Sequence, residues 1–150
     1  MKEQYEKLLT VILTGGSIFA WFTIYNDFLR FQSIYGTIFR IYDCSTPNPV
    51  LTPCFYGGFG FLLAFFWSIK KKMNHLFYLL IGCVVFAWSN FAFEAYKFYF
   101  IPAKVKVSCS GIPTNSIFTT PCFYGAMIFL LALVTIIFYR RELRQNNFEN

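Results

Sequence analysis

Four long apolar runs constrain this chain more than any other feature. They cover about residues 8–29, 53–69, 76–101 and 121–139, and each is long enough, or nearly so, to cross a bilayer. Only 13% of the residues are charged, whereas an ordinary soluble domain has roughly 25%. We therefore predict an all-α membrane protein with four transmembrane helices, in which 150 residues leave no room for a soluble catalytic domain.

The basic residues predict the orientation of these helices. Eight of the thirteen lie before the first run, between the second and third, and after the fourth: Lys2, Lys7, Lys70, Lys71, Lys72, Arg140, Arg141 and Arg144. Cytoplasmic segments carry such an excess of Lys and Arg, so we expect both termini in the cytoplasm and an integral location in a plasma or inner membrane. No small-residue cleavage site closes the first run, which indicates an uncleaved anchor. Because the basic residues are divided among short segments, they do not form a nucleic-acid-binding face.

The cysteines are distributed as this orientation requires. Cys44 and Cys54 share the first outer segment, Cys109 and Cys122 share the second, and Cys83 lies alone within a span. Two cysteines in each outer segment suggest two disulfides formed in an oxidising compartment. Pairing within each segment is the simplest arrangement, although four cysteines allow three pairings.

The chain also repeats itself. Residues 52–64 and 120–132 are identical at ten of thirteen positions at an offset of 68, and both begin with Thr-Pro-Cys-Phe-Tyr-Gly. Upstream the match continues at an offset of 67, with Asp27 aligned to Glu94 and Arg30 to Lys97. We therefore predict a tandem duplication of a two-helix unit, residues 1–73 and 74–150, with the copies related by a pseudo-two-fold axis along the membrane normal.

Each Thr-Pro-Cys sequence is typical of a helix start. Thr suits the N-cap and Pro the first helical position, so Cys54 and Cys122 fall in the first turn, where the helix dipole stabilises a thiolate. Reactive cysteines of redox enzymes often occupy such positions. A structural alternative is that two disulfides, Cys44 to Cys54 and Cys109 to Cys122, staple each outer loop to the next helix. The absence of a Cys-x-x-Cys motif favours the staples.

Two further groups of residues recur in the repeat. The acid and base pairs Asp27 with Arg30 and Glu94 with Lys97 are three residues apart on one helix face, near the outer membrane boundary. We interpret them as interfacial ion pairs, with a polar ring around a shared site as the alternative. Small residues on the second and fourth spans allow close helix packing: Gly57, Gly60, Ala64, Gly125 and Ala132.

Other chemistry has little support. His75 is the only histidine and no carboxylate cluster accompanies it, so no metal site is predicted. No cofactor is implied either, although a quinone or lipid beside Trp21 and Trp88 is an alternative to their packing within the bundle. The alternating segments 39–42 and 104–107 suit short strands, which could pair as a small outer β-ribbon.

These features favour a non-enzymatic function: an accessory or assembly subunit of a larger membrane complex, in contact with lipid and other membrane proteins. A small-solute transporter or channel is less favoured, because Asn90 is the one strongly polar residue well inside a span. In layout the chain resembles the quinone-linked disulfide-forming membrane enzymes, with four helices, cytoplasmic ends and two cysteines in each outer loop. That resemblance implies a thiol-disulfide oxidoreductase, in which Cys44 and Cys54 exchange with a partner protein and Cys109 and Cys122 pass electrons to a quinone.

Overall fold

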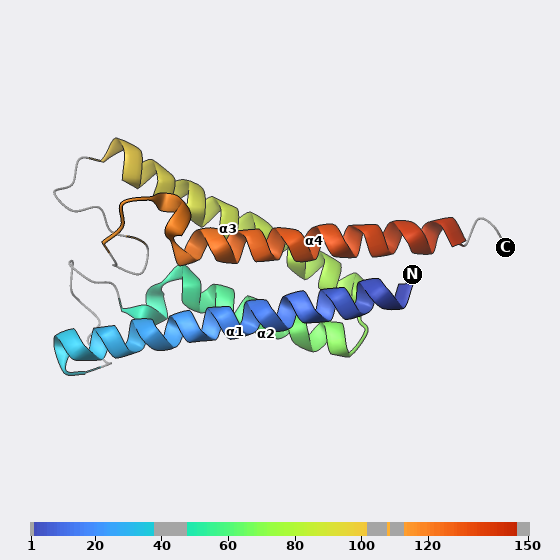
Figure 1. The fold of residues 1–150 in the computed structure, drawn as a ribbon, viewed down its shortest axis with the longest axis horizontal. Coiled ribbons are helices and arrows are strands. Elements are labelled where there is room, and N and C mark those ends of the chain that lie inside the picture. Colours follow the sequence, from blue (N-terminus) through green and yellow to red (C-terminus); the bar gives the residue numbers. More distant parts are fainter. Residues whose placement is uncertain (1, 38–47, 102–107, 109–112, 147–150) are drawn as a thin grey trace.

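The computed structural model describes residues 2–37, 48–101, 108 and 113–146, and these residues form an all-helical bundle (Figure 1). The all-α class is therefore confirmed, and the described part contains no strand. Four α-helices and two short 3-10 helices follow one another: α1 Lys2–Tyr35, η1 Pro49–Leu51, α2 Pro53–Ile69, α3 Met73–Phe100, η2 Ile117–Thr119 and α4 Pro121–Asn146.

Local sequence explains where the helices end. Helix α1 stops at Gly36, which adopts the left-handed conformation with φ 69° and donates its N–H to the carbonyl of Gln32 at 2.8 Å. Helix α2 ends in a tight turn at Lys70–Lys72, where Lys71 has φ 53° and the N–H of Lys72 reaches back to the carbonyl of Trp67 at 3.0 Å. This short turn makes α2 and α3 neighbours in the bundle.

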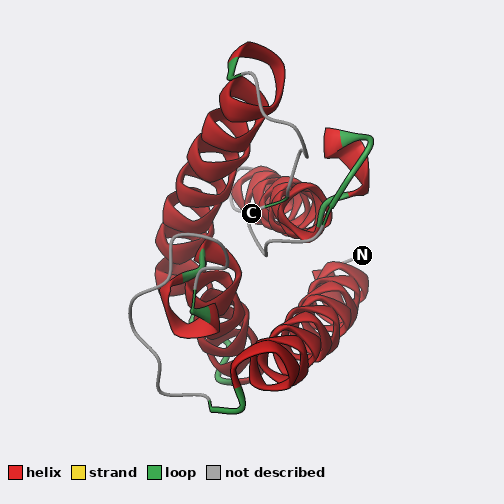
Figure 2. Cartoon of the chain, turned by 90° about the vertical axis from the view of Figure 1, so that its left-hand side faces the viewer, coloured by secondary structure: helices red, strands yellow, loops and turns green. Residues whose placement is uncertain are grey.

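The four helices pack in a ring. Helix α1 contacts α2 and α4, helix α3 contacts the same two, and α2 and α4 also meet across the diagonal. The start of α1, the α2–α3 turn and the end of α4 lie at the same end of the bundle (Figure 1), and Figure 2 looks along the bundle from the opposite end. Successive helices therefore run in opposite directions, as in an up-and-down bundle. The short α2–α3 turn lies at the end where α1 begins, and the longer connections from α1 to α2 and from α3 to α4 lie at the other.

The interior is apolar and tightly packed along the diagonal. The rings of Phe61 and Phe129 are stacked with centroids 3.8 Å apart and planes within 5°, and both are nearly fully buried. Around them lie small side chains and aliphatic side chains that are at most 1% exposed: Leu9, Leu13, Ala64, Leu76, Leu80, Ala132 and Ile136. The close approach of α2 and α4 therefore depends on these small and tightly packed side chains at the centre of the bundle.

The outer surface of the helices is apolar, as expected of a bundle surrounded by lipid. Large side chains such as Phe22, Tyr78 and Val85 are more than 60% exposed. Within the described residues, three helices are long and apolar enough to cross a membrane: α1, α3 and α4. Helix α2 is apolar but has 17 residues, or about 26 Å at 1.5 Å per residue.

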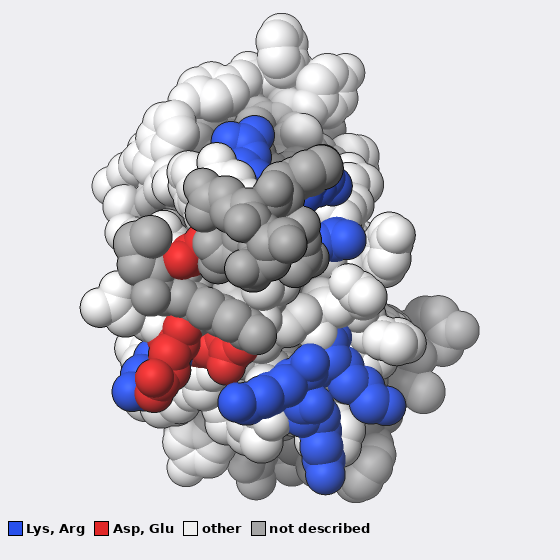
Figure 3. All heavy atoms as spheres, turned by 90° about the vertical axis from the view of Figure 1, so that its right-hand side faces the viewer, with Lys and Arg blue, Asp and Glu red and all other residues white. Residues whose placement is uncertain are grey.

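Charged side chains gather at the end where α1 begins and α4 ends (Figure 3). Glu6 is the centre of a small network there, because its carboxylate accepts a hydrogen bond from Tyr139 at 3.1 Å and pairs with Lys71 at 3.4 Å. This network ties α1 to α4 and to the α2–α3 turn.

Three sequence predictions fall outside the described residues. Cys44 and Cys109 lie in segments 38–47 and 109–112, so neither proposed staple is tested. The segments 39–42 and 104–107 of the predicted β-ribbon also lie outside the described part. All three stay predictions.

Candidate functional site

Two equivalent turns lead into α2 and α4. In the first, the side chain of Asn48 accepts a hydrogen bond from the N–H of Val50 at the start of η1. In the second, the side chain of Ser116 accepts one from the N–H of Phe118 at the start of η2. The two turns are offset by 68 residues, as are the helices that follow them.

The threonines occupy the positions predicted for them but bond differently. Thr52 is the N-cap of α2 and Pro53 follows at the first helical position, yet the Thr52 side chain makes no cap hydrogen bond. Its hydroxyl donates backwards to the carbonyl of Pro49 at 2.7 Å, and that of Thr120 donates to the carbonyl of Ile117 at 2.8 Å. Both threonines are almost completely buried, so each hydroxyl closes the 3-10 turn that precedes its helix.

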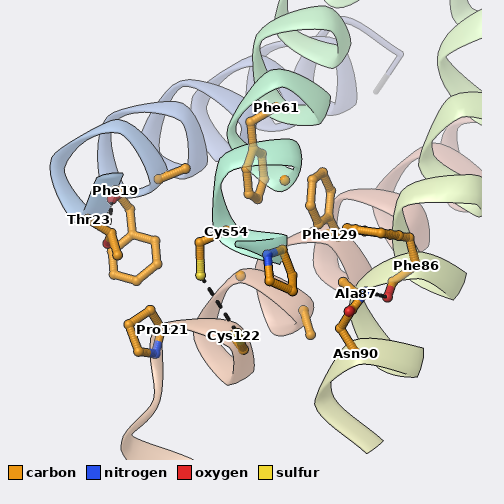
Figure 4. A pocket seen from close by; sticks show the side chains of 15 residues that line it. Phe19, Thr23, Cys54, Phe61, Phe86, Ala87, Asn90, Pro121, Cys122 and Phe129 are labelled. Carbon is orange, nitrogen blue, oxygen red and sulfur yellow. Dashed lines mark hydrogen bonds between the residues drawn. The ribbon is translucent and has the colours of Figure 1, made fainter. Parts of the chain in front are cut away.

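These turns bring the first-turn cysteines of α2 and α4 together. The Sγ atoms of Cys54 and Cys122 are 3.7 Å apart (Figure 4). A disulfide bond measures about 2.05 Å, so the two sulfurs are in van der Waals contact and not bonded to each other. The sequence placed both residues at helix starts but did not indicate that they meet.

The two sulfurs border a small apolar cavity of about 50 Å³ (Figure 4). Helices α2 and α4 contribute four pairs of identical residues, each pair 68 positions apart: Pro53 and Pro121, Cys54 and Cys122, Gly57 and Gly125, and Phe61 and Phe129. A cavity of this volume is smaller than the roughly 150 Å³ that accommodates a benzene ring. We call it the sulfur pocket.

Helices α1 and α3 line the sulfur pocket with three more pairs, each 67 positions apart. Phe19 is matched by Phe86, Ala20 by Ala87 and Thr23 by Asn90. The last pair makes the same kind of backbone contact: the Thr23 hydroxyl donates to the carbonyl of Phe19 at 2.9 Å, and the Asn90 Nδ2 donates to the carbonyl of Phe86 at 2.8 Å. Fourteen of the fifteen residues lining the sulfur pocket are therefore related by the repeat.

The small residues predicted to mediate helix packing separate into two groups. A Cβ at Gly60 would lie 3.1 Å from the sulfur of Cys83, and Ala64 and Ala132 are fully buried. Gly57 and Gly125 are different, because a Cβ at either position would meet no atom within 4 Å. Both line the sulfur pocket, so their missing side chains leave space beside the two cysteines.

The paired charges lie near the ends of α1 and α3, at the same end of the bundle. Arg30 pairs with Asp27 at 3.4 Å, and Asp27 itself is buried. Glu94 is also buried, whereas the amino group of Lys97 lies 4.4 Å from the centre of the Phe93 ring. Both acids are therefore buried within the bundle, and the placement of the two pairs at a membrane interface stays a prediction.

The remaining candidates make ordinary packing contacts. Trp21 packs edge to face on Phe59, and Trp88 does the same on Phe91. His75 lies against Trp67. The described residues contain no cluster of three or more metal-ligating side chains.

Comparison of the chain with protein-family models, with curated proteins and with solved structures finds no match. The class that the fold itself defines is a bundle of four apolar helices suited to a membrane. Its most distinctive feature is a pair of cysteines that meet beside a pocket built from equivalent residues.

Proposed function

We propose that the protein is a membrane thiol-disulfide oxidoreductase, in which Cys54 and Cys122 pass electrons between the two outer cysteine pairs. The observation that carries this proposal is the 3.7 Å separation of the two Sγ atoms. Loop staples alone would not require the cysteines of different loops to be in contact. An exchange between the pairs does require it, because a thiolate must reach the sulfur of the disulfide that it attacks.

The exchange conserves atoms and electrons. The Cys54 thiolate attacks the Cys122 sulfur of a Cys109–Cys122 disulfide, forming a Cys54–Cys122 bond and releasing Cys109 as a thiolate. Cys44 then attacks the Cys54 sulfur, closing Cys44–Cys54 and releasing the Cys122 thiolate. Two electrons move from one pair to the other, and the proton of each attacking thiol is taken up by the thiolate released.

The surroundings of the sulfurs support this chemistry. Both cysteines lie in the first turn of a helix, where the backbone dipole stabilises a thiolate and hence a leaving group. The walls of the sulfur pocket are mostly apolar, so they offer the sulfurs few competing hydrogen-bond partners.

Turnover needs a donor and an acceptor. In this proposal all four helices, α2 included, cross the membrane and place both cysteine pairs outside the cytoplasm. A dithiol protein reduces the Cys44–Cys54 pair, and a membrane quinone reoxidises the Cys109–Cys122 pair. The sulfur pocket is too small for a quinone ring, so the quinone approaches the second pair from elsewhere.

Removal of Cys44 tests the exchange. Without Cys44 the second attack cannot occur, so Cys44→Ser should accumulate a Cys54–Cys122 disulfide that peptide mapping without reduction recovers. Cys83→Ser is the matched control, because that free thiol belongs to neither pair. An intact Cys109–Cys122 disulfide beside an unbonded Cys54 thiol in the Cys44→Ser protein would contradict the proposal.

Turnover provides a second measurement. Purified protein given a dithiol donor should reduce ubiquinone or menaquinone, and Cys109→Ser should abolish the reaction. Absence of quinone reduction in the unmodified protein, together with two staples that resist mild reductant, would make the cysteines structural.

A subunit role in a larger complex is the second candidate. The observation that favours it is the exposure of α3. Only 11% of its apolar 18-residue stretch is buried, compared with 33% of the corresponding stretch in α1 and in α4. A photo-crosslinking residue at Val85 or Phe93, both about 60% exposed, should then capture another membrane protein. The same probe at Val11 on α1 is the control, and capture of lipid alone at all three positions would exclude this role.

A further inference from the structure

A second cavity lies between α1 and α2, at the end of the bundle where α1 begins. It is an open groove of about 790 Å³, much larger than the sulfur pocket. Charged, hydroxyl and apolar residues follow one another along its α1 wall: Glu3, Glu6, Lys7, Thr10, Val11 and Gly15. At 1.5 Å per residue this change from charged to apolar extends over about 18 Å. The groove therefore suits an amphipathic occupant.

The charged end of the groove carries both signs. Lys7 pairs with Glu3 at 2.8 Å, and Lys71 pairs with Glu6 at 3.4 Å. All four side chains line the groove, so their formal charges cancel there. Figure 3 shows acidic side chains beside basic ones at this end of the bundle. Two cations and two anions together are complementary to a group that itself carries both charges.

These ion pairs leave hydrogen-bonding capacity for an occupant. A lysine ammonium has three N–H groups, and each pair uses one of them. The side chains of Lys7 and Lys71 are 73% and 75% exposed, so their other N–H groups are accessible to a phosphate. Glu3 is 79% exposed, and its second carboxylate oxygen can accept a hydrogen bond from an ammonium group.

The hydroxyl groups farther along the groove are already used within the protein. Thr10 donates to the carbonyl of Glu6 at 2.9 Å, and Thr14 donates to the carbonyl of Thr10 at 2.8 Å. Because Thr10 has given away its one hydrogen, the Ser68 hydroxyl must donate to the Thr10 oxygen, 2.9 Å away. This part of the groove therefore offers an occupant mainly apolar contact, from side chains such as Val11 and Ile69.

Lys71 occupies an unfavourable backbone position. Its φ of 53° lies in the left-handed region, where a Cβ is strained and glycine is favoured. The neighbouring Lys70 and Lys72 do not line the groove, and the amino group of Lys70 lies 5.6 Å from the centre of the Phe66 ring. A lysine at the strained position of this turn, and not a glycine, favours a role for its side chain in the groove.

We propose that this groove binds a phospholipid whose headgroup carries a primary ammonium group, as in phosphatidylethanolamine. The phosphate contacts Lys7 and Lys71, the ammonium group donates to Glu3, and an acyl chain lies along α1 and α2. A choline headgroup has no N–H to donate, and phosphatidylglycerol brings a net negative charge to a site that contains two glutamates. The site is independent of the cysteine chemistry and requires only that this end of the bundle lie at a membrane surface.

Native mass spectrometry of the full-length protein in detergent tests this site. The protein is titrated with phosphatidylethanolamine, phosphatidylcholine or phosphatidylglycerol of identical acyl chains, and the dissociation constant of the first bound lipid is measured. We expect phosphatidylethanolamine to bind about fivefold more tightly than either of the others, which is the factor for one charged contact at a membrane surface.

Substitutions in the α2–α3 turn separate the groove from its surroundings. Lys71→Gln should weaken phosphatidylethanolamine binding by about fivefold, because it removes a phosphate contact. Lys70→Gln is the matched control, since it removes the same charge from the same turn outside the groove, and it should leave binding unchanged. Lys71→Gly relieves the strained backbone, so it should fold at least as stably as the unmodified protein and show the same loss of affinity.

A substitution at the acidic side tests recognition of the ammonium group. Glu3→Gln should make the affinities for phosphatidylethanolamine and phosphatidylcholine equal, because the amide attracts an ammonium group less than a carboxylate does.

Three results would overturn the inference. Equal affinities for the ethanolamine and choline lipids in the unmodified protein would show that the ammonium group is not recognised. Tightest binding of phosphatidylglycerol would indicate general attraction to a basic end. Equal losses in Lys71→Gln and Lys70→Gln would place the bound lipid outside the groove.

Discussion

Gly16 shows how little space the centre of the bundle leaves. A Cβ at this position would lie 2.5 Å from a ring carbon of Phe61 and 2.9 Å from Cγ2 of Ile128. The ring of Phe61 has little freedom to move aside, since it is stacked on the ring of Phe129. The adjacent Gly15 faces open space, with no atom within 4 Å of a Cβ.

These neighbouring glycines should therefore respond in opposite ways to alanine. Gly16→Ala should lower the free energy of unfolding by about 1–3 kcal/mol through overpacking. Gly15→Ala should leave it unchanged or raise it by up to about 1 kcal/mol, because alanine is the better helix former. Titration of the purified protein with sodium dodecyl sulfate, followed by circular dichroism, measures both. Equal effects of the two substitutions would refute this account of the packing.

At the residue scale, the sequence predicted which positions are equivalent but not which equivalents touch. The repeat aligned Cys54 with Cys122 and Phe61 with Phe129, and in the structure each of these residues contacts its own counterpart. Such contacts arise only where α2 and α4 cross at the centre. The distance of a residue from that crossing depends on the packing of all four helices, which no local pattern encodes.

The helix starts were the most predictable elements. Thr-Pro located the first residues of α2 and α4, because proline is tolerated there and threonine suits the position before it. The 3-10 turns in front of them were not predicted, since their hydrogen bonds join residues only two or three apart in sequences with no helical period. Helices α1 and α4 also extend into the charged ends that the apolar runs exclude. There, pairs such as Glu3 with Lys7, at 2.8 Å, continue the helix.

The buried threonine of each turn is testable. Thr120→Val keeps the shape but removes the hydroxyl that donates to the carbonyl of Ile117, so it should destabilise the protein by about 1 kcal/mol. Thr120→Ser retains the donor and should cost less. Because the turn holds Cys122 in place, Thr120→Val should also reduce the yield of the Cys54–Cys122 disulfide in the Cys44→Ser background. An unchanged yield would show that the turn does not position the sulfur.

The distribution of charge belongs to the molecule as a whole. Basic side chains from α1, the α2–α3 turn and α4 are far apart in sequence but gather at one end (Figure 3). Because Lys and Arg are enriched on the cytoplasmic side of membrane proteins, we predict that this basic end lies in the cytoplasm.

Cysteine labelling measures this orientation. An impermeant thiol reagent applied to intact cells should modify Gln32→Cys, at the outer end of α1, and should not modify Lys72→Cys until the cells are lysed. Both positions are exposed, so burial does not explain a difference between them. The unsubstituted protein gives the background from the native cysteines, and the reverse pattern would invert the topology.

The stack of Phe61 on Phe129 has a consequence for how such a site can change. In a homodimer of two-helix units, a residue on the symmetry axis faces its own copy, so each substitution is made twice and the site stays symmetric. Here both stacked rings belong to one chain, so either ring can be replaced while the other is kept. A single chain thus permits two unlike sides around the stack, which no assembly of identical subunits with two-fold symmetry can achieve.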